Sequence, residues 1–176
     1  MPQFTFRTEL LPWSFLEGLD GGGRCLILGV AYPYIVREAV ERLNPAEVVV
    51  VETSHEVLET EAKAVQGAVR VKPVFTRVIE RVVELPSSSF DLVIAVNSLE
   101  RAMQKRGFMT EVRRLLKEGG RVLIVTRLRN FFRRSGLKGG EFEKLISMDG
   151  FQVVHKSVSW GRATALLIKT TISQQP

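Results

Sequence analysis

The feature that most constrains the fold is an alternation of short apolar runs with helical segments from residue 24 onward. Five runs rich in Val, Ile and Leu, most of them starting about 22 residues apart, occupy residues 24–30, 47–52, 69–74, 90–96 and 121–126. Near-continuous apolar runs are typical of strands that are covered on both faces. Because helices between successive strands lead to parallel pairing, the pattern predicts a parallel sheet.

The segments around the strands complete this expected architecture. Apolar residues at helical spacing predict helices over 35–43 and 108–116, and the glycines of "KEGG" (117–120) are interpreted as the stop of the second helix. Further helices are expected over 12–20 and 139–150. The last two apolar runs are joined only by "GR", a link so short that it predicts an antiparallel hairpin. The expected fold class is a Rossmann-like three-layer α/β sandwich, with a mostly parallel seven-stranded sheet ending in that hairpin.

A chain of 176 residues fits one domain, with residues 1–21 as a helical lead-in. Cys25 is the only cysteine, so an intramolecular disulfide and a cysteine zinc site are excluded, and a buried structural thiol is expected. The two histidines lie far apart in the sequence, and no metal site is expected. Without a secretory leader pattern or an apolar stretch of about 18–20 residues, the chain is expected to be cytoplasmic and not bound to a membrane.

Candidate site residues follow the predicted strands. Ligands of open α/β sheets bind beyond the carboxyl ends of the strands, where the strand order reverses. Glu52 closes the second apolar run, and a carboxylate there can accept hydrogen bonds from both hydroxyls of an adenosine ribose. Its alternative role is to start the following helix, where an acidic residue is favourable. Thr53 and Glu56 form a T-x-x-E capping box that is better suited to that role.

Three stretches together resemble the class I S-adenosylmethionine-dependent methyltransferases. "LPSSSFDLVIAVNSLERA" (85–102) is similar to the fourth-strand signature of that family, and "FMTEVRRLLKEGGRVLIVTRLRN" (108–130) is similar to its next helix, glycine turn and fifth strand. "VVVVETSHEVLETEAKA" is similar to its second strand and helix, and the likeness covers about residues 22–170. The resemblance implies S-adenosylmethionine as cofactor. By the family's pattern and the strand ends, the cofactor-binding residues are Gly29, Val30, Ala31, Tyr32, Glu52, Thr53, Phe75, Thr76, Asn97, Ser98 and Leu99.

The chain departs from the family at two places. The first loop of the family usually reads acid-x-Gly-x-Gly-x-Gly, whereas an alignment on Gly29 places Ile27, Ala31 and Pro33 at the other three positions. Alanine at a position that requires positive φ costs about 1–2 kcal/mol, while proline suits the first turn of a helix. The family's Leu-Glu-His after the fourth strand reads Leu-Glu-Arg here, ending at Arg101. These changes leave a second hypothesis open, a non-catalytic methyltransferase-like protein that serves in binding or assembly.

The charge distribution bears on the acceptor of the methyl group. Residues 1–100 hold 9 basic and 14 acidic residues, whereas residues 101–176 hold 16 basic and 5 acidic residues. The segment "TRLRNFFRRSGLKGG" (126–140) follows the fifth strand, and its arginines and phenylalanines suit phosphate contacts and base stacking. The alternative is a solvated loop whose phenylalanines cover the core. The hypothesis is a methyltransferase with an unidentified, anionic or nucleic-acid acceptor, and its candidate acceptor contacts are Arg129, Arg133 and Arg134. If the site is open, a homo-oligomer or a partner subunit is expected to complete it. No catalytic residue is assigned.

Overall fold

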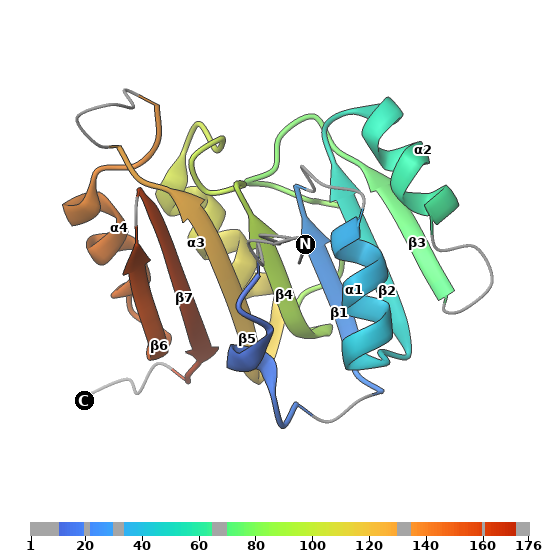
Figure 1. Ribbon diagram of the computed structural model, residues 1–176, viewed down its shortest axis with the longest axis horizontal. Helices are drawn as coiled ribbons and strands as arrows, with labels where there is room; N and C mark the ends of the chain where they lie inside the picture. The colour runs from blue at the N-terminus through green and yellow to red at the C-terminus, as the bar shows by residue number, and fades with distance from the viewer. Residues whose placement is uncertain are drawn as a thin grey trace, which may run out of the picture.

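The computed structural model describes residues 11–19, 22–29, 34–64, 70–129, 135–159 and 161–171, without the side chains of residues 61–64 and 70. Its sheet has seven strands in the order β3-β2-β1-β4-β5-β7-β6 (Figure 1). The strands are β1 (Arg24–Leu28), β2 (Glu47–Glu52), β3 (Arg70–Phe75), β4 (Phe90–Val96), β5 (Leu116–Arg127), β6 (Phe151–Ser159) and β7 (Arg162–Lys169). The helices are the 3-10 helix η1 (Trp13–Leu16), α1 (Tyr34–Leu43), α2 (His55–Ala64), α3 (Lys105–Leu115) and α4 (Gly139–Ile146). None of these helices is long and apolar enough to cross a membrane.

The sheet is parallel except at β7. Parallel pairs join β1 to β2 and β4, β2 to β3, and β4 to β5, whereas β7 pairs antiparallel with both β5 and β6. The chain first moves outward from β1 to β3 and then returns to the other side of β1 at β4. The strand order therefore reverses between β1 and β4, and this point defines the ligand-binding edge.

Two apolar layers cover the sheet, as expected for strands without a polar face. One cluster packs η1, α1 and Leu58 of α2 against one face. The other packs α3, α4 and the β3–β4 connection against the opposite face. In Figure 1, α1 lies in front of the sheet while α3 and α4 lie behind it. The predicted three-layer α/β fold with a terminal hairpin is confirmed.

Three local expectations are wrong. The helix expected over 12–20 is only the single 3-10 turn η1, and the helix expected over 139–150 ends at Ile146. The glycines of residues 117–120 do not stop α3, because α3 ends at Leu115 and Leu116 already has extended backbone angles. Those glycines instead lie in an irregularity of β5, where the pairing with β4 jumps from Leu116 to Arg121. Gly119 has φ +73° there, a conformation that favours glycine.

The connection between β3 and β4, which the structure describes in full over residues 76–89, contains no helix and is held against α3 by polar contacts. Glu111 accepts the backbone N–H of Val82 at 2.8 Å and pairs with Arg114 at 2.7 Å. Arg114 also donates to the carbonyl oxygens of Val82 and Leu85 at 3.1 and 2.9 Å. The hydrogen bond from Arg114 holds the pKa of Glu111 below its ordinary value. This network fixes the connection that borders the ligand-binding edge.

Candidate functional site

Gly29 ends β1 at the point where the strand order reverses. Its φ is +66°, and a Cβ atom there would lie 2.6 Å from Ser98 Oγ and 2.9 Å from Ile79 Cδ1. Both distances are shorter than real Cβ contacts, and positive φ adds strain for a side chain. The backbone N–H of Gly29 donates to the Val51 carbonyl at 2.9 Å. The geometry therefore requires glycine at the residue predicted to approach the cofactor most closely.

The turn after β4 lies directly against Gly29. Asn97 has φ +53°, and its backbone N–H donates to the Val125 carbonyl at 2.7 Å. The Ser98 hydroxyl contacts the carbonyl oxygen of Leu28, and it lies 3.1 Å from the Val96 carbonyl. Leu99 is fully buried in the core, so its side chain packs and only its backbone borders the edge. Two parallel strands are thus joined at their carboxyl ends by a serine side chain.

Glu52 ends β2 with only 1% of its surface exposed. Its Oε1 atom accepts the backbone N–H of Thr53 at 2.6 Å, the Thr53 hydroxyl at 3.0 Å and Arg101 Nη2 at 3.2 Å. Among the described residues, no donor contacts Oε2. A buried carboxylate whose Oε2 has no described donor can accept one hydroxyl of a ribose diol there.

The capping box predicted for Thr53 and Glu56 does not form. The Thr53 hydroxyl donates to Glu52, and it is the Ser54 Oγ that accepts the Val57 N–H at 3.5 Å at the start of α2. The helix begins at His55, one residue later than the capping box requires, so Ser54 becomes the N-cap. Thr53 is therefore released from helix capping and orients the Glu52 carboxylate.

An aromatic stack lies at the end of β3, the next strand of the sheet. The Phe75 ring stacks on His55 of α2 with the centroids 3.8 Å apart and the planes 8° apart, and Phe75 is 37% exposed. The backbone N–H of Thr76 donates to the Glu52 carbonyl at 3.1 Å, which ties this end of β3 to β2. His55 is not predictable from the sequence, because an exposed histidine in the first turn of a helix carries no pattern of its own.

Arg101 stands out in the sequence only as a departure from the family. It lies in the turn after β4, and its Nη2 atom contacts both Glu52 Oε1 at 3.2 Å and the Thr53 hydroxyl at 3.1 Å. The guanidinium side chain is 44% exposed, whereas the Glu52 side chain is 2% exposed. A partly exposed cation therefore neutralises a buried carboxylate at the ligand-binding edge.

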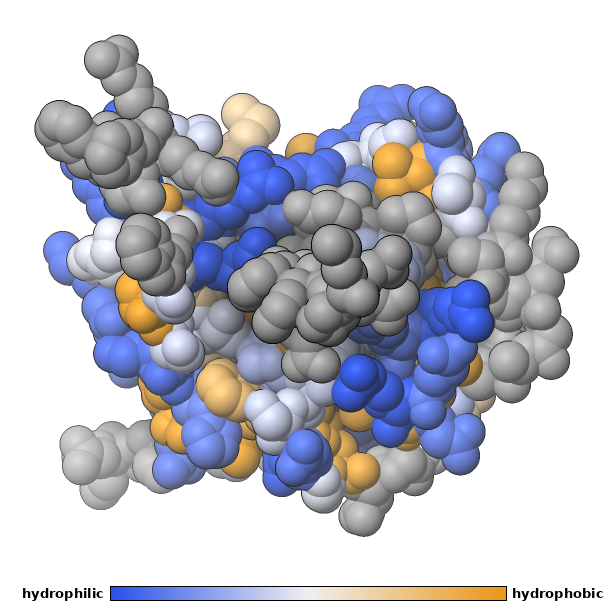
Figure 2. Space-filling view, viewed as in Figure 1, coloured by the Kyte–Doolittle hydropathy of each residue, from blue (hydrophilic) through white to orange (hydrophobic). Residues whose placement is uncertain are grey.

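The end of β5 borders the same edge and carries basic side chains. Arg127 and Arg129 are exposed, and within the described part of the chain neither guanidinium has an acidic partner. The backbone of this segment is fixed, because Leu128 N–H donates to the Gly161 carbonyl and Arg129 N–H to the Leu137 carbonyl, both at 2.7 Å. Figure 2 shows strongly hydrophilic surface along this edge above β4 and β5. Five predicted contacts lie outside the described residues: Val30, Ala31, Tyr32, Arg133 and Arg134.

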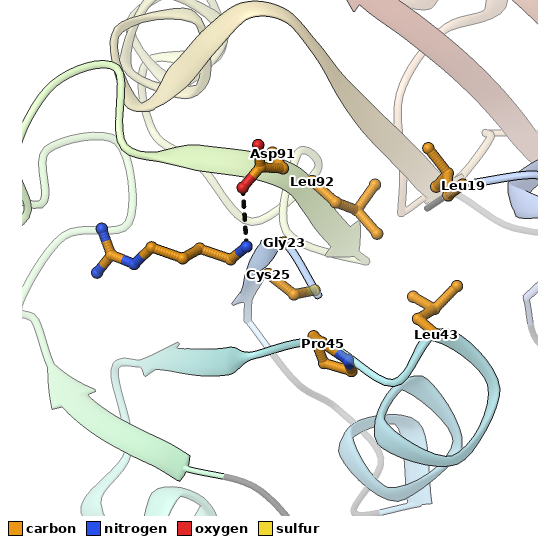
Figure 3. Close-up of a pocket in the computed structure, with 8 residues that line it drawn as sticks. Leu19, Gly23, Cys25, Leu43, Pro45, Asp91 and Leu92 are labelled. Carbon is orange, nitrogen blue, oxygen red and sulfur yellow. Dashed lines mark hydrogen bonds between the residues drawn. The ribbon is translucent and has the colours of Figure 1, made fainter. Parts of the chain in front are cut away.

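A small pocket lies at the opposite, amino-terminal edge of the sheet and is lined by Cys25, Leu43, Pro45 and Leu92 among others (Figure 3). Its volume of about 50 Å³ is far below the roughly 300–1,000 Å³ of a small-molecule site. Burial raises the pKa of the Cys25 thiol to about 12, so the thiolate is not available at neutral pH. Cys25 is thus a buried thiol, as expected from the sequence.

A family model described as a methyltransferase domain matches residues 28–124, which are more than half of the chain and include the ends of β1, β2, β3 and β4. The chain belongs to the methyltransferase-domain family. The family predicted from the sequence is confirmed, and with it a methyltransferase activity that uses S-adenosylmethionine as cofactor. A search of curated protein sequences finds no match.

Solved structures of methyltransferases share the fold of this methyltransferase domain at low sequence identity. The methyltransferase in a complex with the Haloferax volcanii Trm112 activator has 11% identity and a TM-score of 0.75, over 88% of this chain and 85% of that one. An S-adenosylmethionine-dependent methyltransferase from Mesorhizobium loti has 14% identity and a TM-score of 0.74, over 89% and 95% of the two chains. One from Aquifex aeolicus has 18% identity and a TM-score of 0.68, over 90% and 89%.

Proposed function

We propose that this methyltransferase transfers the methyl group of S-adenosylmethionine to an anionic acceptor that binds beside the end of β5. The observation that supports the acceptor class is the pair of exposed guanidinium groups, Arg127 and Arg129, without acidic partners in the described part of the chain. Unpaired guanidinium groups bind phosphate and carboxylate groups through two parallel hydrogen bonds. The acceptors that fit are a single-stranded nucleic acid or a small phosphorylated or carboxylated molecule.

The residues present fit the cofactor. Gly29 lets the chain turn sharply at the end of β1, because its positive φ and its contacts with Ser98 and Ile79 admit no Cβ atom. Glu52 Oε2 is without a described donor and is suited to a ribose hydroxyl, while the exposed face of the Phe75 and His55 stack is suited to the adenine ring. Asn97 and Ser98 would border the methionine end of the cofactor, as the family pattern implies.

The chemistry needs little more than alignment. When bound, S-adenosylmethionine supplies an activated methyl group on a positively charged sulfur, and transfer is a direct displacement. The contribution of the chain is to hold the acceptor in line with that group, and such positioning supplies up to about 7–11 kcal/mol in favourable cases. The fixed backbone of residues 127–129 is suited to this role, because hydrogen bonds to Gly161 and Leu137 hold it in place.

A partner subunit is part of the proposal. The Haloferax volcanii structure contains a methyltransferase bound to its Trm112 activator. In the present chain, Val78, Val83 and Met103 expose 43%, 70% and 87% of their surfaces on the connections that border the ligand-binding edge. Large contiguous apolar patches mark surfaces that another protein covers, and in this proposal these three side chains belong to such a patch.

The double substitution R127Q/R129Q tests the acceptor class. If the acceptor is single-stranded nucleic acid, its affinity falls with salt at a log–log slope of about −0.7 per phosphate neutralised. Loss of two contacts should therefore make the slope shallower by about 1.4 units, as measured by fluorescence anisotropy with a labelled oligonucleotide at several salt concentrations.

The matched control is R37Q/R42Q on α1, which removes two arginines from a helix that covers one face of the sheet. It should leave the slope unchanged. An equal change of the salt slope in the two double variants would show that oligonucleotide binding is non-specific. Absence of oligonucleotide binding at low salt would exclude nucleic acid and leave the small anionic acceptor.

A further inference from the structure

The Arg101 side chain lies across the place where the cofactor is proposed to bind. Arg101 follows β4, Glu52 ends β2, and β1 lies between these two strands in the sheet. A contact of 3.2 Å between Arg101 Nη2 and Glu52 Oε1 therefore spans the carboxyl end of β1, where Gly29 is required by the local geometry. The ion pair and the ribose of the cofactor both need the Glu52 carboxylate.

The contacts of Glu52 show which donor can leave. A carboxylate has about four lone-pair sites on two oxygens, and Oε1 already accepts three donors. Oε2 can take one hydroxyl of a ribose diol, but a second hydroxyl on Oε1 must displace one of the three donors that already fill the lone-pair sites of that oxygen. The Thr53 N–H is fixed by the backbone and its hydroxyl belongs to the same residue, whereas the Arg101 side chain is 44% exposed and can move into solvent. Arg101 is therefore the donor that the ribose displaces.

The charge on Arg101 determines which group it can bind after its release from Glu52. The strand that precedes it, β4, has β5 as its other neighbour, and β5 ends at Arg127. Glu100, the nearest acidic residue in sequence, is already hydrogen-bonded by the Thr126 hydroxyl at 2.5 Å. A guanidinium group released from Glu52 thus stands at an edge that already carries Arg127 and Arg129, where an anion is the partner that restores neutrality.

We propose that Arg101 couples the cofactor site to the acceptor site. It pairs with Glu52 in the free protein, is displaced when the ribose takes that carboxylate, and then binds an anionic group of the acceptor. The inference rests on the proposed function and adds a specific role for Arg101. Both ligands favour the state in which Arg101 is released from Glu52. Each must therefore strengthen the binding of the other by the same factor. The expected coupling factor is about fivefold, at the lower end of the usual range.

The first experiment uses S-adenosylhomocysteine and inorganic pyrophosphate as probes, with the ionic strength held constant by potassium chloride. In calorimetric titrations of the unmodified protein, saturating pyrophosphate should lower the Kd of S-adenosylhomocysteine about fivefold. The R101Q variant should bind S-adenosylhomocysteine about as tightly without pyrophosphate as the unmodified protein does with it, and pyrophosphate should have no further effect. R106Q removes an exposed arginine from the first turn of α3 and should keep the coupling intact.

A second measurement needs no substitution. Adenosine carries both ribose hydroxyls and 2′,3′-dideoxyadenosine carries neither. Pyrophosphate should therefore strengthen the binding of adenosine but not that of 2′,3′-dideoxyadenosine, as followed by ligand-observed NMR titration. Weaker binding of S-adenosylhomocysteine to R101Q, or a pyrophosphate effect of equal size on both nucleosides, would overturn the role of Arg101. Binding of S-adenosylhomocysteine without any coupling would overturn this role alone, whereas failure of the unmodified protein to bind it would overturn the proposed function as well.

Discussion

Replacement of Glu52 with alanine is expected to raise the Kd of S-adenosylhomocysteine at least tenfold. The carboxylate is buried at the end of β2, and each hydrogen bond from a ribose hydroxyl to a charged acceptor contributes about 1.5–3 kcal/mol. Even one lost bond of this kind corresponds to more than a tenfold change in affinity. The measurement is calorimetric titration of the purified variant, after circular dichroism has shown that the fold is retained.

Glu56→Ala is the matched control for this result. Glu56 lies four residues later, in the first turn of α2, and is exposed. Its removal changes the net charge by the same amount but leaves the Glu52 carboxylate in place, so the affinity should stay within about twofold of the unmodified protein. A Glu52→Ala variant that binds as tightly as the unmodified protein would remove the ribose assignment.

Gly29→Ala should have a larger effect than Glu52→Ala on the stability of the protein. The new Cβ atom would lie 2.6 Å from Ser98 Oγ, which bonds to the Leu28 carbonyl and joins the ends of β1 and β4. Positive φ costs about 1–2 kcal/mol and the overpacked contact about 1–3 kcal/mol more. The free energy of unfolding, measured by urea denaturation, should fall by about 2–5 kcal/mol, and binding of S-adenosylhomocysteine should be lost.

Gly107→Ala separates this effect from a general response to added volume. Gly107 lies inside α3, and its added Cβ would lie 3.4 Å from the Gln104 side chain, which is an ordinary contact. Because alanine is the better helix former, this variant should gain about 0.5–1 kcal/mol of stability. A Gly29→Ala variant with unchanged stability and binding would mean that the end of β1 has another conformation.

The strands and the Glu52 position could be predicted because they depend on local patterns. Runs such as Val48–Val51 are buried on both faces of the sheet, and that burial leaves a continuous apolar signature in the sequence. Glu52 is conspicuous because a charge follows such a run directly. The hairpin of β6 and β7 was predictable since only a short link separates the two runs.

The partners of side chains could not be predicted in the same way. The contact between Arg101 and Glu52 joins residues 49 positions apart, and it depends on β1 lying between their strands and on the side-chain conformation of Arg101. The choice between Thr53 and Ser54 as N-cap depends on a shift of a single residue in the start of α2, within the usual uncertainty of helix boundaries. Sequence pattern therefore predicted the strand ends that form the candidate site, while the hydrogen bonds between them required the structure.

The β5 irregularity shows why glycine signals are ambiguous. "KEGG" has the composition of a helix stop, yet the structure uses it to shift the register between β4 and β5. A buried Lys169 on β7 donates to the Leu116 carbonyl at 2.8 Å and pairs with Glu118 at 3.0 Å, which holds this segment in the strand. Lys169 lies more than 50 residues later in the chain, so the local sequence carries no sign of it.

The altered first loop is expected to permit cofactor binding still, with Gly29 and Glu52 as the main contacts of the cofactor. Calorimetric titration of S-adenosylhomocysteine into the unmodified protein tests this expectation without any substitution. We predict saturable binding of one ligand per chain with a Kd in the micromolar range, equivalent to about −8 kcal/mol. Absence of binding at millimolar ligand would contradict it and would favour a methyltransferase fold that serves only in binding or assembly.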